Sequence, residues 1–213
     1  MLIITRRNAI LSGSAATLAA MSGLAKGAVP TSAQELGPFY PVHHFADTDA
    51  DLTRVRGHGG LAKGTPINVL GRVVDLKGNP VPNARLEIWQ ANAAGRYMHP
   101  GDTANPAPLD PNFQGFAILR TDRSGHFKFR SVKPGAYPIG GGRIRTPHIH
   151  MDVTGRSERL TTQMYFPGEE LNAKDIVFAY ADPKESVVSR AVDPLSGDPG
   201  ALAYAWDIIL AVG

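Results

Sequence analysis

Two histidines and two tyrosines are the residues of this chain whose types and spacing suit a metal site. His148 and His150 stand at positions i and i+2, so on an extended strand both imidazoles project from one face. Tyr137 precedes them, and Tyr97 lies further upstream. A phenolate is a hard oxygen donor with a free pKa of about 10, so only a strongly acidic cation keeps it ionised at neutral pH. This donor set favours ferric iron over zinc.

The neighbourhood of these residues strengthens the metal-site interpretation. A single His-x-His pair on a strand is common, and a lone buried tyrosine usually fills a core. Here the segments Pro134–Pro138 and Gly140–Gly142 precede Arg145 and the histidine pair. Glycine and proline at this density suit a backbone that bends around something small.

Composition and charge indicate an ordinary globular domain. The chain has 213 residues, of which 43% are hydrophobic and 19% charged, enough for one domain with a real core. The formal net charge of +3 comes from residues 1–28, which contain Arg6, Arg7, Lys26 and no acidic residue. The rest of the chain carries no basic stripe, so no nucleic-acid partner is expected.

The N-terminal segment is typical of an export signal. The run Thr5–Leu11 contains the pair Arg6-Arg7 of a twin-arginine signal, and the uncharged stretch that follows is too polar for a stable membrane span. We therefore expect residues 1–28 to be a cleaved signal that directs the protein to the periplasm. The chain has no cysteine, so any metal must be held by nitrogen and oxygen donors.

The rest of the chain is predicted to form an extended arm followed by short strands. Residues 29–64 are rich in Pro, Gly, His and Asp without periodicity, and residues 65–213 alternate between apolar and polar positions. Turns of the form D-x-x-G at Asp75–Gly78 and Asp122–Gly125 predict antiparallel hairpins. Alternation from Leu202 to Val212 predicts one final strand, and residues 183–192 are the only helix candidate. The pattern predicts an all-β fold, an antiparallel β-sandwich with long loops around the metal site.

Longer motifs carry a resemblance to a known family. The sequence resembles the intradiol ring-cleavage dioxygenases, and within them the β-chain type of the protocatechuate 3,4-dioxygenases. The motifs, which span nearly all of the chain after residue 31, are Leu36–Pro41, Leu86–Tyr97, Pro108–Phe113, Pro134–Pro138, Pro147–His150, Thr162–Phe166, and Leu202–Tyr204 with Asp207.

The resemblance implies a ligand set and a reaction. Tyr97 and His150 would bind a non-haem ferric ion in its equatorial plane, and Tyr137 and His148 would be the axial ligands. A catecholic substrate would chelate the iron, displace Tyr137 and react with O2, and its ring would open between the two hydroxylated carbons. The iron would act as a Lewis acid and template.

Other residues of the expected site carry less specific signals. Arg145 and Gln163 match positions that face the substrate, and Tyr40 and Ile139 are candidates for lining its pocket. The segment between Tyr137 and His148 is shorter than in typical protocatechuate enzymes, and Ile139 stands where the β chain usually has tryptophan. The ring substituent of the substrate therefore stays open, as do a homo-oligomer and a paired α chain. We expect Trp89 and Trp206 to be core residues.

Two alternative functions explain part of the sequence pattern. A non-catalytic exported module with a prealbumin-like core would explain the strands and turns, but it has no use for two tyrosines and two histidines together. A zinc or copper hydrolase would use the histidine pair, but the sequence offers no third histidine or carboxylate base at suitable spacing.

Strand parity and the family resemblance predict opposite orientations for the Arg145 side chain. Counted back along an ideal strand from His148, position 145 has the opposite parity, so its side chain should point away from the metal. The resemblance places it over the substrate. Pro147 and the glycines at 140–142 favour an irregular approach to the strand, so we expect the resemblance to hold.

Overall fold

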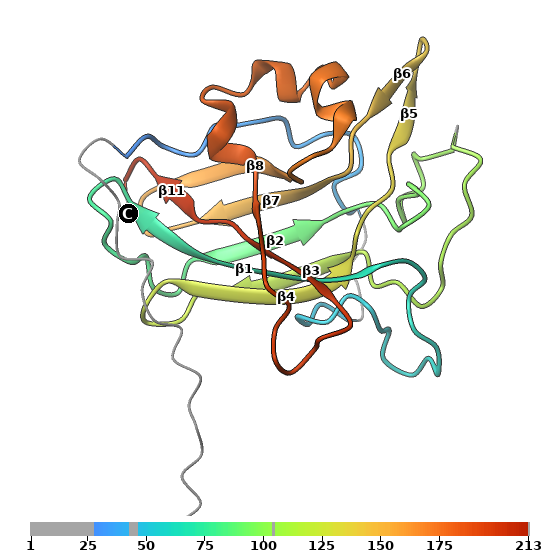
Figure 1. The fold of residues 1–213 in the computed structure, drawn as a ribbon, viewed down its shortest axis with the longest axis horizontal. Helices are drawn as coiled ribbons and strands as arrows, with labels where there is room; N and C mark the ends of the chain where they lie inside the picture. The colour runs from blue at the N-terminus through green and yellow to red at the C-terminus, as the bar shows by residue number, and fades with distance from the viewer. Residues whose placement is uncertain (1–27, 43–46, 104, 213) are drawn as a thin grey trace, which may run out of the picture.

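The structure, a computed structural model, describes residues 28–42, 47–103 and 105–212. The arginine pair of the predicted export signal lies outside the described residues. Within them the regular elements are strands and short 3₁₀-helices (Figure 1). The strands are β1 (Pro66–Asp75), β2 (Arg85–Trp89), β3 (Phe116–Arg120), β4 (His126–Val132), β5 (Tyr137–Gly140), β6 (Arg143–Arg145), β7 (His148–Thr154), β8 (Arg159–Tyr165), β9 (Arg190–Val192), β10 (Leu202–Ala205) and β11 (Ile208–Leu210). The 3₁₀-helices are η1 (Glu170–Lys174), η2 (Phe178–Tyr180) and η3 (Lys184–Val187).

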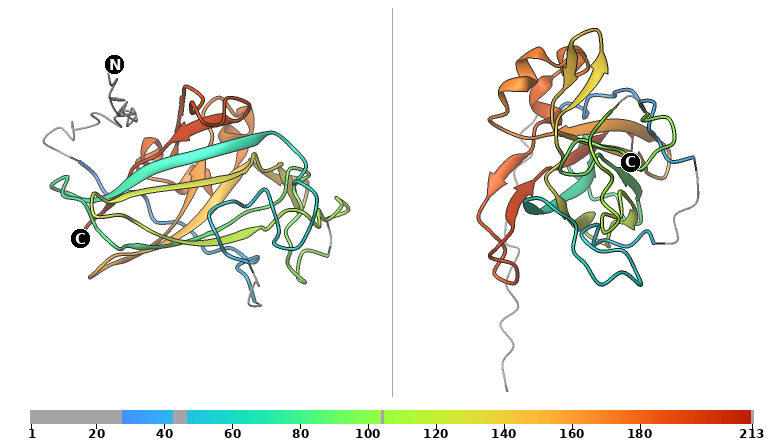
Figure 2. Two further views of the ribbon diagram at one scale, coloured as in Figure 1. Left: turned by 90° about the horizontal axis from the view of Figure 1, so that it is seen from below. Right: turned by 90° about the vertical axis from the view of Figure 1, so that its right-hand side faces the viewer.

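Two packed sheets form the body of the molecule (Figures 1 and 2). One sheet has the order β3-β2-β7-β8, and all of its pairings are antiparallel. The other has the order β11-β1-β10-β9, with β4 also paired to β1. Strands β5 and β6 form a separate hairpin that projects from the body (Figure 1). The predicted all-β sandwich is confirmed, although β10 and β11 run parallel to β1.

Strand alternation separates the core from the site. On β7, Ile149, Met151 and Val153 belong to the hydrophobic cluster between the sheets, so His148 and His150 lie on the opposite face. Trp89 is buried as expected, but in a second cluster that contains Tyr97 and Tyr137. Trp206 lies in the main core. The outer face of the β3-β2-β7-β8 sheet therefore carries a second buried region, and the candidate site is in it.

The two D-x-x-G turns form as predicted, but the strands β1–β2 and β3–β4 that they connect do not pair as hairpins; antiparallel pairing at the first turn is limited to a bridge between Val74 and Pro80. In each, the glycine N–H donates to the aspartate carbonyl, at 2.9 Å for Gly78 and 3.1 Å for Gly125. The aspartate carboxylate also accepts two backbone N–H groups of the turn. The flanking strands then separate, because β1 and β4 belong to one sheet and β2 and β3 to the other. These turns therefore carry the chain from one sheet to the other.

The C-terminal segment also departs from the prediction. The expected single strand is divided into β10 and β11 around Trp206, whose N–H donates to Leu70 O at 2.9 Å. At Gly71, a Cβ would lie 1.8 Å from Trp206 O, so only glycine permits this approach. The helix predicted over residues 183–192 is wrong beyond one 3₁₀ turn: η3 ends at Val187, and Arg190–Val192 pairs with β10 as β9. Pairing with a neighbouring strand outweighs the weak local helical pattern.

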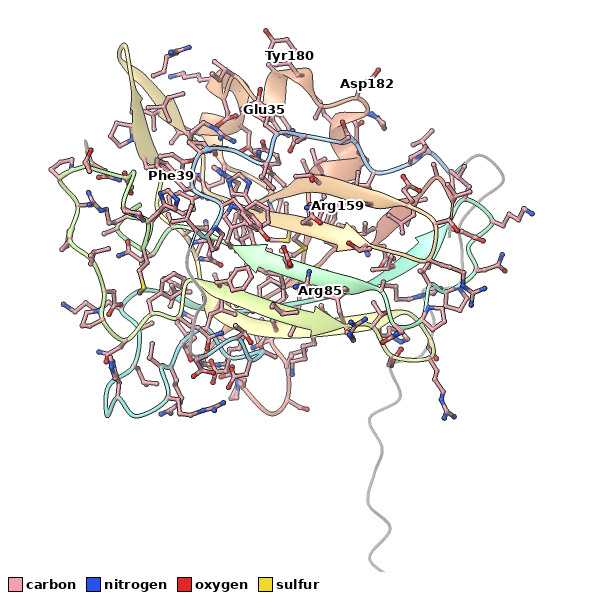
Figure 3. The ribbon with its side chains drawn as sticks, turned by 180° about the vertical axis from the view of Figure 1, so that it is seen from behind. Glu35, Phe39, Arg85, Arg159, Tyr180 and Asp182 are labelled. Carbon is pink, nitrogen blue, oxygen red and sulfur yellow. The ribbon has the colours of Figure 1, made fainter. Side chains whose placement is uncertain are left out.

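The N-terminal arm is held against β11 and β8, one strand of each sheet, by hydrogen bonds between residues distant in sequence. Thr31 N–H donates to Ile209 O and Gln34 N–H to Thr161 O, at 2.9 and 2.8 Å. Figure 3 shows this arm crossing beside β8 and descending at Phe39. No helix in the described part of the chain has the length and apolar character needed to cross a membrane.

Candidate metal centre

The structure brings the four predicted donors together around His148. Its Nε2 lies 3.2 Å from His150 Nε2, 3.4 Å from Tyr137 Oη and 3.5 Å from Tyr97 Oη. All four side chains are buried, with exposed fractions between 1% and 3%. The two imidazoles come from one face of β7, Tyr137 begins β5, and Tyr97 comes from the loop after β2.

Close backbone contacts bring the two tyrosine segments together. Gly95 has φ of +82°, and a Cβ there would lie 2.3 Å from Ala136 O. A Cβ on Gly135 would lie 2.6 Å from Ala93 O. Both contacts require glycine, so the loop of Tyr97 nests directly against the segment that leads into Tyr137. The loop itself is fixed by Asp102, whose carboxylate accepts the N–H of Tyr97 at 2.9 Å.

Burial sets the protonation of all four groups. It lowers the pKa of His148 and His150 well below the usual range, and the nearby Arg145 charge lowers both further. Both imidazoles are therefore neutral near pH 7, and each has a lone pair to donate. Burial also raises the pKa of Tyr97 and Tyr137, so without a cation the phenols keep their protons. Only a strong Lewis acid would make them phenolates.

These residues fit a metal ion. Ligands at about 2.0–2.2 Å from one ion lie roughly 3 Å or more from each other, which is near the observed spacing. His148 has the hydrogen bond typical of a metal-binding imidazole, from Nδ1–H to Thr146 O at 2.6 Å. The described residues contain no group of three or more His, Cys, Asp and Glu suited to a metal. Two tyrosines complete the donor set here, and this N₂O₂ combination suits Fe(III) better than zinc.

A hydrogen-bonded wall borders the four donors on one side. Arg145 donates from Nε to Asp175 at 2.8 Å and from Nη2 to Gln163 Oε1 at 2.6 Å, and its Nη2 lies 3.4 Å from Tyr165 Oη. Burial opposes the guanidinium charge, but Tyr137, Asp175 and Tyr165 raise the pKa of Arg145, so it stays charged. We call Arg145, Gln163, Tyr165 and Asp175 the polar wall.

The strand pairing resolves the question of where Arg145 points. Arg145 ends β6 and pairs with Tyr137 across the β5–β6 hairpin, whereas His148 begins β7 after Thr146 and Pro147. Parity counted from His148 therefore does not extend to position 145. Arg145 is only 5% exposed and is close enough to Tyr137 and both histidines to shift their pKa values.

An aromatic wall borders the donors on the other side. Phe39 packs against Tyr97 and Tyr137, with ring centroids 4.8 and 6.1 Å apart. Trp89 stacks on His150 at 4.8 Å with the planes 9° apart, and Tyr40 meets Trp89 edge-on at 5.0 Å. We call Phe39, Tyr40 and Trp89 the aromatic wall. Ile139 is half-buried against the same cluster.

Some of these residues were not found by sequence reasoning. The predicted pocket residue Tyr40 packs on Trp89 and donates from its hydroxyl to Glu87, whereas its neighbour Phe39 contacts the tyrosines. Asp175 has no local pattern that marks it, and Tyr165 lies in the motif Thr162–Phe166, which did not predict a role for it. Among the other histidines, His58 is bonded to Pro111 O, and His43 and His44 lie outside the described residues.

Comparison with known proteins places this architecture in a family. A family model described as Dioxygenase matches residues 36–212. The protocatechuate 3,4-dioxygenase β chain of Burkholderia cepacia is 41% identical over 182 residues, which cover 83% of this chain and 77% of that protein. Hydroxyquinol 1,2-dioxygenase of Corynebacterium glutamicum is 29% identical over 208 residues, with 86% of this chain and 64% of that enzyme covered. This chain thus spans less than two thirds of the hydroxyquinol enzyme.

A solved structure supports the same placement. The dioxygenase domain of a dioxygenase carbohydrate-binding protein fusion from Streptomyces sp. SirexAA-E matches with a TM-score of 0.64 and 26% identity, covering 87% of this chain and 100% of that one. The family match extends from the arm through both sheets and includes the residues of the candidate metal centre. This chain belongs to the intradiol ring-cleavage dioxygenases.

Proposed function

We propose that this protein is a non-haem ferric-iron dioxygenase that opens the ring of a catecholic substrate between its two hydroxyl groups, with O2 as co-substrate. The observation that carries the proposal is the convergence of four donors beside a buried Arg145. The donor atoms of Tyr97, Tyr137 and His150 all lie within 3.5 Å of His148 Nε2. A bound Fe(III) would supply Lewis acidity and a template for the catechol oxygens.

Tyr137 is the residue suited to take a proton from the substrate. Burial raises the pKa of its phenol, so the phenolate is a strong base once it no longer contacts a cation. The Arg145 charge lowers that pKa and limits the effect. Tyr137 begins the projecting β5–β6 hairpin, whereas the histidines lie within a four-stranded sheet, so the hairpin residue is the ligand with more freedom to leave.

Arg145 is suited to stabilise negative charge on the substrate. Its Nε and Nη2 are engaged by Asp175 and Gln163, whereas Nη1 has no hydrogen-bond partner among the described residues. The guanidinium is thus held in place with one donor group unused. A fixed donor of this kind contributes most where charge develops in the transition state, because it needs no reorganisation there.

The substrate we propose is a catecholic acid such as protocatechuate, which would give a cis,cis-muconate-type dicarboxylic product. The similarity to a protocatechuate 3,4-dioxygenase β chain supports this choice. Ile139, half-buried beside the tyrosines, is a candidate for contact with the ring substituent. Oxygen uptake with protocatechuate, catechol and hydroxyquinol, measured side by side, tests the preference.

Metal analysis and product identification test the function itself. The folded protein should contain one ferric ion per chain and show a broad visible band from phenolate-to-iron charge transfer. The product should carry both new carboxylates at the carbons that bore the hydroxyls. A colourless, active protein with zinc, or ring opening beside the diol, contradicts the proposal.

We also propose that the protein is exported to the periplasm through Arg6 and Arg7 and that the signal is cleaved. Changing both arginines to lysine should retain the protein in the cytoplasm, whereas Lys26→Ala, a charge change in the same segment, should not. Periplasmic delivery of the double variant contradicts this route. A homo-oligomer or a paired α chain is the assembly we propose, and native mass spectrometry of the purified protein distinguishes these two.

A further inference from the structure

The two candidate histidine ligands are held in different ways. His148 has its second nitrogen fixed by the Thr146 carbonyl at 2.6 Å. His150 Nδ1 is buried and has no hydrogen-bond partner among the described residues. Metal-binding histidines usually donate this second N–H to a carbonyl, a carboxylate or water, which fixes the ring orientation. His150 Nε2 faces His148 Nε2 at 3.2 Å, so on its Nδ1 side the ring has no hydrogen bond from the described residues to orient it.

Two contacts confine the His150 ring, one on its face and one at its edge. Trp89 is its cross-strand partner between β2 and β7, and the two rings are nearly parallel at 4.8 Å. Gly37 of the arm approaches the ring edge. A Cβ on Gly37 would lie 3.1 Å from Cε1 and 3.6 Å from Nε2 of His150. Only a hydrogen atom fits comfortably there, so the arm backbone closes on the imidazole.

Tyr40 fixes the arm in this place. Its ring and that of Trp89 form an edge-to-face pair with an angle of 88° between the ring planes, and its hydroxyl donates to Glu87 Oε2 at 2.5 Å. Glu87 and Trp89 stand at i and i+2 on β2, so both face the arm. Glu87 is 6% exposed and also pairs with Arg85. Its carboxylate is thus a buried anchor, and Figure 3 shows Arg85 on this face of the sheet.

We infer that the segment Gly37–Tyr40 is a clamp that orients the His150 imidazole for metal binding by packing, with Tyr40 and Glu87 as its anchor. Gly37, Tyr40 and Glu87 are positioning residues: they act through His150 and Trp89. The inference rests on the proposed function, because the orientation of His150 matters for function only if this residue binds the metal. It predicts that iron affinity depends on arm residues that contact no iron.

A matched pair of glycine variants tests the clamp. Gly37 and Gly168 both have φ of +75°, so alanine carries the same backbone cost at each position. A Cβ on Gly168 would meet nothing within 4 Å, whereas one on Gly37 meets His150. Gly37→Ala should bind iron about ten- to a hundredfold more weakly, the scale for losing support of a metal ligand. Gly168→Ala should bind iron as the unmodified protein does.

A second readout does not depend on iron. In crystal structures of the metal-free variants, Gly37→Ala should move His150 Nε2 away from its 3.2 Å approach to His148 Nε2, and Gly168→Ala should not. An unchanged approach in Gly37→Ala overturns the clamp. If that approach is lost as expected but the unmodified protein takes up no iron, the clamp stands and the proposed function fails.

Tyr40→Phe covers the case in which Gly37→Ala does not fold. This change keeps the ring on Trp89 and removes only the hydroxyl that bonds Glu87. Ferric-ion titration of the metal-free protein should show a loss of affinity of up to about tenfold. Iron affinity equal to that of the unmodified protein shows that the anchor has no positioning role and overturns that part of the inference.

Discussion

The two walls of the metal centre hold their residues by different physics. In the polar wall, Arg145, Gln163, Tyr165 and Asp175 are joined by directional hydrogen bonds from 2.6 to 3.4 Å. In the aromatic wall, Phe39 and Trp89 pack against the donors, and Tyr40 packs against Trp89. Hydrogen bonds hold the charged guanidinium in one orientation, whereas packing holds an aromatic ring in place without adding a charge.

This difference suggests a division of tasks. The polar wall carries the cation that would act on the substrate, and its buried carboxylate keeps that cation in place. The aromatic wall contacts Tyr97, Tyr137 and His150 and would preserve the geometry of the ligands. Changes in the polar wall should therefore alter turnover, and changes in the aromatic wall should alter metal binding.

The largest effect is expected between the walls, at the histidines. His148→Ala or His150→Ala removes a neutral nitrogen donor from the centre, so each variant should lose its iron and its visible colour. His58→Ala, at an exposed histidine bonded to Pro111 O, is the control and should keep both. Iron content by elemental analysis decides the outcome. A full complement of iron in either centre variant would mean that the ligand set is wrong.

Arg145→Ala tests the polar wall and should lower kcat by roughly a hundredfold, the scale for losing one strong charge-stabilising donor. The substitution also leaves Asp175 buried without its cation, which costs about 3–5 kcal/mol of stability in typical buried pairs. Asp175 keeps three backbone N–H donors, from Thr146, Val177 and Phe178, so the lower end is expected.

The double variant Arg145→Ala/Asp175→Asn separates these two effects. It removes the unpaired charge, so thermal stability should recover in part while kcat stays low. Steady-state kinetics and thermal unfolding measure the two quantities independently. Recovery of kcat together with stability would make Arg145 a structural residue, and the division between the walls would fail.

Much of this centre was predictable because its signals are local. The i, i+2 spacing of His148 and His150 places both on one strand face whatever the strand's neighbours are. Asp175 was not predictable, since it reaches Arg145 from the loop between η1 and η2 and nothing around it in sequence indicates a partner. The D-x-x-G turns show the same limit. Their internal hydrogen bonds are local, but the sheet that each following strand joins depends on distant residues.

The metal-free centre should also make stability depend on pH. Burial lowers the pKa of His148 and His150 in the folded protein, whereas in the unfolded chain it is about 6.5. Below that pH the unfolded state binds more protons, so stability falls as pH falls from about 6.5 toward the folded pKa values. Each histidine contributes up to about 1.4 kcal/mol per pH unit.

Denaturant unfolding of the metal-free protein at several pH values between about 6.5 and 5 measures this slope. Carboxyl groups have unfolded pKa values near 4, so they contribute little in that window. His150→Gln should reduce the slope by the share of one histidine. A slope equal to that of the unmodified protein would show that His150 is not held neutral by burial.

The smallest effects, and the sharpest comparison of the walls, come from two tyrosines that each lose one hydroxyl. Tyr165→Phe removes a hydrogen bond to Gln163 at 3.1 Å in the polar wall, and Tyr40→Phe removes the bond to Glu87 in the aromatic wall. Each should cost about 1–3 kcal/mol of stability, as losing one partner of a buried polar group does.

Tyr165→Phe should lower kcat several-fold at unchanged iron affinity, because its hydroxyl supports the groups that hold Arg145. Tyr40→Phe should weaken iron binding while kcat per bound iron stays the same, since its hydroxyl supports only the orientation of His150. Ferric-ion titration and kinetics normalised to iron content separate the two outcomes. If both variants lose kcat per bound iron equally, the walls act as one unit, because a change on either side then reaches the reacting groups.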